Sequence, residues 1–173
     1  RVREAERGVI YSEFMDREDD IMTGIVQRID SKFIYVSLGK IEALLPANEQ
    51  MPNEKYKPHD RIKVYITKVE KTTKGPQIFV SRTHPGLLKR LFEIEVPEIY
   101  DGTVEIRSVA REAGDRSKIS VHSDNEEVDP VGSCVGPKGQ RVQAVVNELK
   151  GEKVDIVRWS EDPVVFVANA LSP

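Results

Sequence analysis

The stretch Val131-Gly-Ser-Cys-Val-Gly-Pro-Lys-Gly-Gln-Arg-Val-Gln-Ala-Val-Val-Asn-Glu-Leu-Lys-Gly151 decides how the second half of this chain folds. It contains a Gly-x-x-Gly loop, Gly136-Pro137-Lys138-Gly139, and a helical pattern begins directly after the loop. Four residues at the spacing i, i+3, i+4, i+7 predict one apolar helix face: Val142, Val145, Val146 and Leu149. Gly151 stands where a glycine commonly ends a helix.

A shorter helix is predicted before the loop. Asp129-Pro130 is typical of an N-cap residue followed by proline at the first helical position, which starts a helix over residues 131–135. Two glycines three residues apart are weak evidence alone, because they also fit an ordinary corner between two helices. The alternative is a clamp for nucleic acid. Glycines lack Cβ and admit a nucleic-acid backbone, while the helix N-terminus and Lys138 supply positive charge.

The flanking residues favour the clamp. Val104 and Ile106 alternate in one strand pattern, Ile119 and Val121 in a second, and a turn over residues 112–116 joins them. A third strand pattern follows the loop region, with Val154, Ile156 and Trp159. Helix, strand, strand, helix, Gly-x-x-Gly, helix, strand is the order of a bacterial, type II KH domain. Such a domain grips about four nucleotides of single-stranded RNA.

The expected RNA-binding residues of this half include the four residues of the loop. We expect RNA contacts from Val135, Gly136, Pro137, Lys138, Gly139, Arg141 and Lys118.

Composition bounds the class of protein. The 173 residues have room for one or two domains, and 39% hydrophobic with 32% charged residues is a soluble, globular mixture. No apolar run approaches membrane-spanning length. A single cysteine excludes an intramolecular disulfide and a cysteine-rich zinc site, so we expect a cytoplasmic protein. The net charge of −3 hides a basic segment: residues 21–84 hold 11 basic and 6 acidic side chains, a net charge of +5.

That basic segment predicts five short strands. Turn signals separate them, and no long helix intervenes, which is typical of a small closed OB-fold β-barrel. The expected strands cover residues 21–29, broken by Gly24, then 33–38, 41–45, 61–69 and 77–82, with a turn at Thr73-Lys74-Gly75-Pro76. Alternation places Ile34, Val36 and Leu38 inside the barrel.

The outward side chains of the barrel mix aromatic and basic groups. Bases stack on aromatic rings while lysine and arginine hold phosphates, so we expect RNA contacts from Phe33, Tyr35, Lys63 and Arg82. The alternative is that the aromatics cover a domain interface or a neighbouring strand, and for the outward Phe79 we favour this alternative.

Four segments are expected along the chain. Residues 1–20 predict a connecting helix from a missing N-terminal domain, because the chain starts at Arg1 without methionine and is expected to be a fragment. We interpret the acidic run Asp16, Glu18, Asp19 and Asp20 as a solvated helix end rather than a metal site. The barrel covers residues 21–84, the KH domain 85–160, and residues 161–173 form a helix or linker toward a missing second KH domain.

Two resemblances extend this interpretation. Tyr35-Val-Ser-Leu-Gly39, Glu42-Ala-Leu-Leu-Pro46 and His59-Asp60-Arg-Ile-Lys-Val64 resemble the RNA-binding domain of ribosomal protein S-one. A barrel of this S-one type before a KH domain is similar to the NusA family of bacterial transcription elongation, termination and antitermination factors. Nearly the whole chain carries that similarity, in motifs such as Asp129-Pro-Val-Gly-Ser-Cys-Val-Gly136, Glu148-Leu-x-Gly-Glu-Lys153 and Asp155-Ile-Val-Arg-Trp-Ser160.

The resemblance implies an α+β protein that contacts nascent single-stranded RNA and regulates pausing by RNA polymerase. It implies polymerase contact through parts mostly outside this fragment, and other antitermination factors as further partners. We expect a monomer that does not associate with membranes.

No enzymatic chemistry is expected. Cys134 has no base nearby in sequence and is expected to be buried, and the three histidines, His59, His84 and His122, lack metal-ligand spacing. The acidic run from Asp124 to Asp129 fits a solvated loop better than a magnesium site. We therefore expect neither a cofactor nor a metal.

Two other functions stay open. One is an RNA-binding subunit like those of the exosome cap, which also place a barrel before a KH domain. The other is a protein-interaction scaffold with a degenerate KH fold. Residues 85–173 hold 11 basic and 16 acidic side chains, and this acidic balance keeps the scaffold function open.

Overall fold

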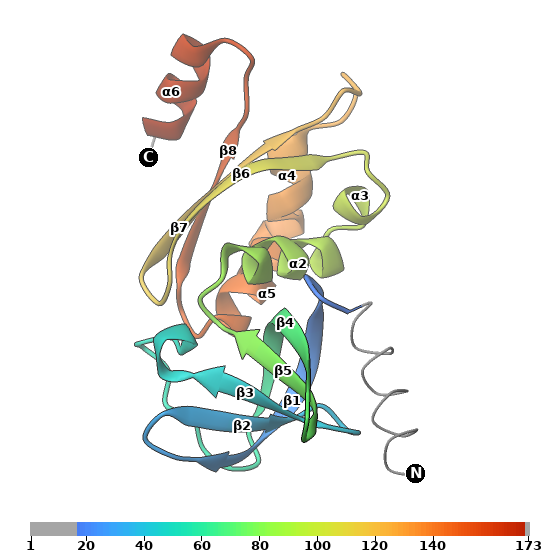
Figure 1. The fold of residues 1–173 in the computed structure, drawn as a ribbon. Helices are drawn as coiled ribbons and strands as arrows, with labels where there is room; N and C mark the ends of the chain where they lie inside the picture. Colours follow the sequence, from blue (N-terminus) through green and yellow to red (C-terminus); the bar gives the residue numbers. More distant parts are fainter. Residues whose placement is uncertain (1–16, 172–173) are drawn as a thin grey trace. The chain divides into compact units, whose positions relative to one another are not determined.

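The structure, a computed structural model, describes residues 17–171. The chain folds into two compact units, with the boundary between Leu87 and Leu88 (Figure 1). We call residues 1–87 the barrel unit and residues 88–173 the KH unit. Most of the connecting helix predicted over residues 1–20 lies outside the described residues, and residues 17–19 form a turn. None of the helices within residues 17–171 is long and apolar enough to cross a lipid bilayer.

The barrel unit contains the five predicted strands. They close in the order β1-β2-β3-β5-β4, with β3 and β5 parallel and the other neighbours antiparallel, which confirms the OB-type barrel. Their bounds are β1 Ile21–Ile29, β2 Phe33–Ser37, β3 Glu42–Pro46, β4 Arg61–Thr72 and β5 Gly75–Ser81. The turn between β4 and β5 is tighter than predicted. Thr72 pairs with Gly75 and donates its hydroxyl to the Gly75 carbonyl at 2.6 Å.

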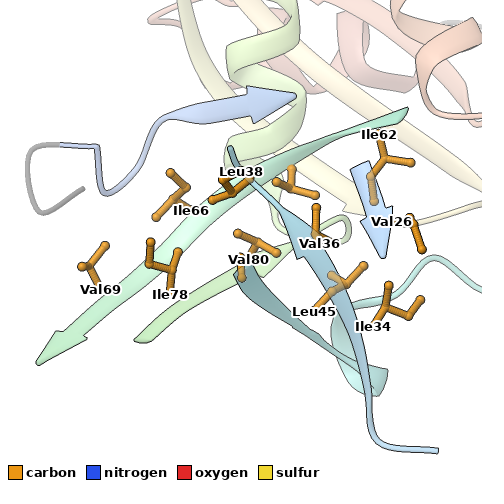
Figure 2. Close-up of a cluster of buried hydrophobic side chains, with 12 residues drawn as sticks. Val26, Ile34, Val36, Leu38, Leu45, Ile62, Ile66, Val69, Ile78 and Val80 are labelled. Carbon is orange, nitrogen blue, oxygen red and sulfur yellow. The ribbon is translucent and has the colours of Figure 1, made fainter. Parts of the chain in front are cut away.

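The period-two prediction of the barrel core is confirmed. Figure 2 shows the inward side chains of all five strands gathered in one cluster, with Val36, Leu45 and Val80 fully buried. The expected break of β1 at Gly24 is wrong, because the strand runs through this residue. A Cβ at Gly24 would stand 2.3 Å from Val36 Cγ1, so glycine is required for β1 to cross β2 this closely.

The acidic run before β1 belongs to the barrel rather than to a solvated helix end. Glu18 Oε1 accepts the backbone N–H of Val69 at 2.8 Å, and Asp19 Oδ1 accepts the Tyr65 hydroxyl at 2.7 Å. Asp16 lies outside the described residues. Tyr65 lies outside the core cluster of the barrel, but only 6% of it is exposed, and its ring stacks on His84.

The KH unit has the predicted order of elements, with one further short helix near its start, and this confirms the type II KH fold. Its elements are α2 Pro85–Glu95, which begins in the barrel unit, α3 Pro97–Tyr100, β6 Glu105–Glu112, β7 Arg116–His122, α4 Pro130–Val135, α5 Gln140–Glu148, β8 Lys153–Arg158 and α6 Pro163–Leu171. The sheet order is β6-β7-β8, antiparallel and then parallel. Residues of its core include Ile119, Val121, Cys134, Val145 and Leu149, each almost completely buried.

A buried ion pair holds one end of this sheet, and the sequence patterns do not predict it. Both Arg111 and Glu152 have fully buried side chains. The Glu152 carboxylate accepts hydrogen bonds from Arg111 Nε and Nη2, from the Gly114 backbone N–H and from the Ser117 hydroxyl. It therefore ties the β6–β7 hairpin to the turn between α5 and β8.

We expect Glu152→Gln to lower the free energy of unfolding of the KH unit by about 3–5 kcal/mol, since removing one partner leaves a buried charge poorly compensated. Trp159 is the sole tryptophan and lies in this unit, so its fluorescence during urea denaturation follows this transition. Asp155→Asn is the matched control. Its partner Arg116 is 64% exposed, and this exposed pair contributes about 0–1 kcal/mol. Equal losses in the two variants would contradict the role of burial.

Candidate nucleic-acid interface

The Gly-x-x-Gly loop is a single tight turn between two helices, as predicted. It begins where α4 ends, at Gly136, and passes through a short 3-10 turn at residues 137–139 into α5. The Gly136 N–H donates to the Gly132 carbonyl, and the Gly139 N–H donates to the Gly136 carbonyl. Pro137 and Lys138 are exposed at its tip. The loop thus presents a charged side chain on a backbone held at both ends.

Glycine is required at Gly136 and favoured at Gly139, for different reasons. Gly136 has φ 77° and ψ 172°, a region that residues with a Cβ almost never adopt. A Cβ there would also stand 2.6 Å from Arg141 Cγ. Gly139 has φ 74°, and the place where its Cβ would stand has no atom within 4 Å. That open space leaves room for a nucleic-acid backbone beside the loop.

Arg141 stabilises the loop through hydrogen bonds to the helices around it. Its Nη1 donates to Glu98 Oε2 and to the Ser133 carbonyl, both at 2.8 Å, so it joins α3, α4 and α5. The side chain is 27% exposed. Val135 is half-buried in the last turn of α4, directly before the loop. The structure therefore brings Val135 and Arg141 to the loop, and it pairs the charge of Arg141 with Glu98.

Lys118 belongs to a different surface of the KH unit. It alternates with Ile119, so it faces away from the buried side of β7. Its ammonium group donates to the Ala170 carbonyl in the last turn of α6. With Arg116, Asp155 and Leu171 it lines an open hollow of about 580 Å³. The structure therefore does not bring Lys118 to the glycine loop, and the sequence pattern alone does not show which face of the sheet carries the helices.

On the barrel, the two predicted aromatics share one surface of β2. The rings of Phe33 and Tyr35 lie 6.5 Å apart, tilted by 57°, and both residues are half-buried. Arg28 joins them, with its guanidinium carbon 3.9 Å from the centre of the Tyr35 ring. Lys63 lies on β4, and β1, which pairs with both strands, separates β4 from β2. Sequence reasoning missed Arg28, although pairing the two strands as a hairpin places it opposite Tyr35.

Arg82 is a correction to the expected site. Its side chain is fully buried, Nε and Nη2 donate to the Glu54 carboxylate, and Nη1 donates to the Lys63 carbonyl at 2.8 Å. It therefore fastens the loop between β3 and β4, and none of its surface is left for a phosphate. The prediction failed because β5 ends at Ser81, and alternation no longer gives the direction of the next side chain.

Ionisation within the two surfaces follows their hydrogen bonds. Backbone N–H groups of Phe33 and Lys32 donate to Asp30 and lower the pKa of its carboxyl, while the hydrogen bond to Asp30 raises the pKa of the Tyr35 hydroxyl. Tyr35 is therefore neutral at physiological pH.

Burial raises the pKa of the Cys134 thiol to about 12, which leaves no thiolate to act as a nucleophile. Within residues 17–171, no three His, Cys, Asp or Glu side chains gather as metal ligands would.

We expect Gly136→Ala to destabilise the KH unit more than Gly139→Ala. The first variant meets backbone strain and a clash with Arg141, whereas the second meets only the strain of a positive φ, about 1–2 kcal/mol. Urea denaturation followed by Trp159 fluorescence measures both. Loss of stability in the Gly139 variant that equals or exceeds the loss in the Gly136 variant would refute this account of the loop.

Comparison with known families agrees with both halves of this geometry. Residues 82–159 match the NusA-like first KH domain, and residues 15–81 match the S1 RNA binding domain, the S-one type of the sequence analysis.

Three relatives, each described as a transcription termination/antitermination protein NusA, align with the whole chain. Identity is 89% for the protein of Bacillus subtilis, 82% for that of Halalkalibacterium halodurans and 55% for that of Thermus thermophilus. The chain covers 47%, 45% and 45% of these relatives, just under half of their length. Its fold, its glycine loop and these similarities show that the chain belongs to the NusA family, of which it carries the S1 RNA binding domain and the NusA-like first KH domain.

Proposed function

We propose that this chain binds nascent single-stranded RNA and that, within a longer protein, it regulates pausing, termination and antitermination by RNA polymerase. The observation that carries the proposal is the loop at residues 136–139, with an exposed lysine at its tip and open space beside Gly139. A phosphate backbone requires both features, because it must approach closely and its charge must be balanced.

The proposed RNA contacts fall into two groups. In the KH unit they are Gly136, Pro137, Lys138 and Gly139, with Val135 and Arg141 supporting the loop and Lys118 on the other face of the sheet. In the barrel they are Phe33, Tyr35 and Lys63. The net charge of +5 over residues 21–84 supports a barrel that attracts RNA, since local field rather than total charge steers association.

The regulatory role rests on the relatives. Their names describe transcription termination and antitermination, and they are about twice as long as this chain. We assign polymerase contact mainly to the parts that this chain does not share, other antitermination factors to the whole protein, and the site of action to the cytoplasm. Residues 21–84 and 85–160 are the two RNA-binding modules of this proposal.

The competing scaffold function makes a different prediction for the loop. A scaffold with a degenerate KH fold has no use for an exposed lysine on a strained turn, whereas an RNA clamp needs one. The left-handed conformation of the exposed Lys138, at φ 56°, therefore favours RNA binding. An exosome-cap-like subunit would also bind RNA, but the match of residues 82–159 to the NusA-like first KH domain favours the transcription factor.

We expect Lys138→Asp to weaken binding of a short unstructured RNA by roughly tenfold or more, for all sequences alike, because phosphate contacts position RNA without reading bases. The dependence of affinity on salt should become shallower by about one unit of slope. The fold should persist, since Asp tolerates a positive φ. The measurement is a titration of labelled RNA at several salt concentrations.

Lys153→Asp is the matched control, because this lysine at the start of β8 is exposed and undergoes the same change of charge. It should bind RNA nearly as well as the unmodified chain. Equal affinities and salt slopes for the two aspartate variants would show that the glycine loop is not the clamp.

A further inference from the structure

Arg28 reaches the aromatic surface of the barrel through an irregularity in β1. The pairing of β1 with β2 shifts register between Val26 and Arg28, so Arg28 lies directly opposite Tyr35. Residues opposite one another in a strand pair project from the same face of the sheet. The extra residue, Gln27, thus turns the arginine onto the face of Phe33 and Tyr35, and bulges commonly re-aim side chains in this way.

The guanidinium of Arg28 is held in place but remains open to solvent. One side of it rests on the Tyr35 ring, with 3.9 Å between the guanidinium carbon and the ring centre. Nevertheless, 67% of the Arg28 side chain is exposed. Contact with the ring limits the freedom of a long side chain, so less entropy is lost when its N–H groups bind a further partner.

Two carboxylates compete for this cation. Glu42 Oε1 lies 3.6 Å from Arg28 Nη2, longer than a charge-assisted hydrogen bond, and its side chain is 41% exposed. Asp30 also interacts electrostatically with Arg28, but its carboxylate already accepts hydrogen bonds from the N–H groups of Lys32 and Phe33. The bond between Arg28 and Glu42 is consequently loose, and a stronger anion can replace the carboxylate.

We propose that Arg28 binds a phosphate of single-stranded RNA and that Glu42 competes with this phosphate for the guanidinium. A phosphate offers the same pair of oxygens as a carboxylate and forms the same two-bond contact with arginine. Tyr35 then acts in part as a positioning residue that presents Arg28, besides stacking on bases. This inference deepens the proposed function, because it rests on RNA binding by the barrel.

Competition between Glu42 and RNA for Arg28 can be distinguished from simple charge repulsion between Glu42 and RNA. If Glu42 only repelled RNA by its charge, removing that charge would raise affinity whether or not Arg28 is present. If Glu42 occupies the donors of Arg28, its removal raises affinity only while the arginine is there. A double-mutant cycle over these two positions therefore separates the two mechanisms.

The experiment measures binding of a short unstructured RNA by the whole chain at several salt concentrations, with circular dichroism to verify folding. We expect Arg28→Ala to lower affinity about fivefold to tenfold and to reduce the salt slope by about one unit. Glu42→Gln should raise affinity severalfold in the unmodified chain and leave it unchanged in the Arg28→Ala background. Arg28→Lys keeps the charge but not the fork of N–H groups, and it should restore the salt slope but only part of the affinity.

The outcomes are distinguishable from failure of the proposed function. If the unmodified chain binds RNA and Lys138→Asp weakens it, while Arg28→Ala binds like the unmodified chain, the role of Arg28 is refuted and the clamp stands. An equal gain from Glu42→Gln in both backgrounds refutes the competition. If the unmodified chain binds no RNA at all, the proposed function fails and this inference fails with it.

Discussion

The KH unit depends on the hydrogen bonds and the ion pair that the buried carboxylate of Glu152 forms. A charge removed from water must be satisfied by donors, and here the donors come from Arg111, Gly114 and Ser117. These groups belong to a hairpin, while Glu152 follows α5 in sequence. Satisfying one charge therefore fixes the C-terminal end of α5 against the sheet. The N-terminus of the same helix carries the glycine loop.

The barrel unit also contains a buried ion pair, in which the side chains of Arg82 and Glu54 are both almost completely buried. Arg82 is enclosed by Glu54 and by the Lys63 carbonyl, and it fastens the long connection between β3 and β4. In each unit, a pair of charged residues that sequence alone would assign to the surface is buried and holds an irregular segment in place. The four charged groups of these two pairs are thereby shielded from solvent, whereas Lys138 and Arg28 are exposed.

The two candidate RNA surfaces are built on different principles. In the loop, backbone conformation is the determining feature: Gly136 adopts a φ that places the turn, and Arg141 packs in the space its missing Cβ leaves. On the barrel, side chains are the determining feature, since Tyr35 supports the guanidinium of Arg28. A rigid backbone grips any phosphate chain, whereas a supported arginine can be adjusted by a neighbouring carboxylate such as Glu42.

Local patterns in the sequence were sufficient for the order of elements, the inward faces of the barrel strands and the loop at residues 136–139. These features follow from residue spacing and from the conformational freedom of glycine, which are properties of neighbouring residues in the chain. Burial of Arg82 depended on tertiary structure, because the Glu54 carboxylate and the Lys63 carbonyl that enclose it come from distant positions in the chain. Alternation ends where a strand ends, and beyond that point only packing between distant segments determines whether a charged side chain meets solvent or a buried partner.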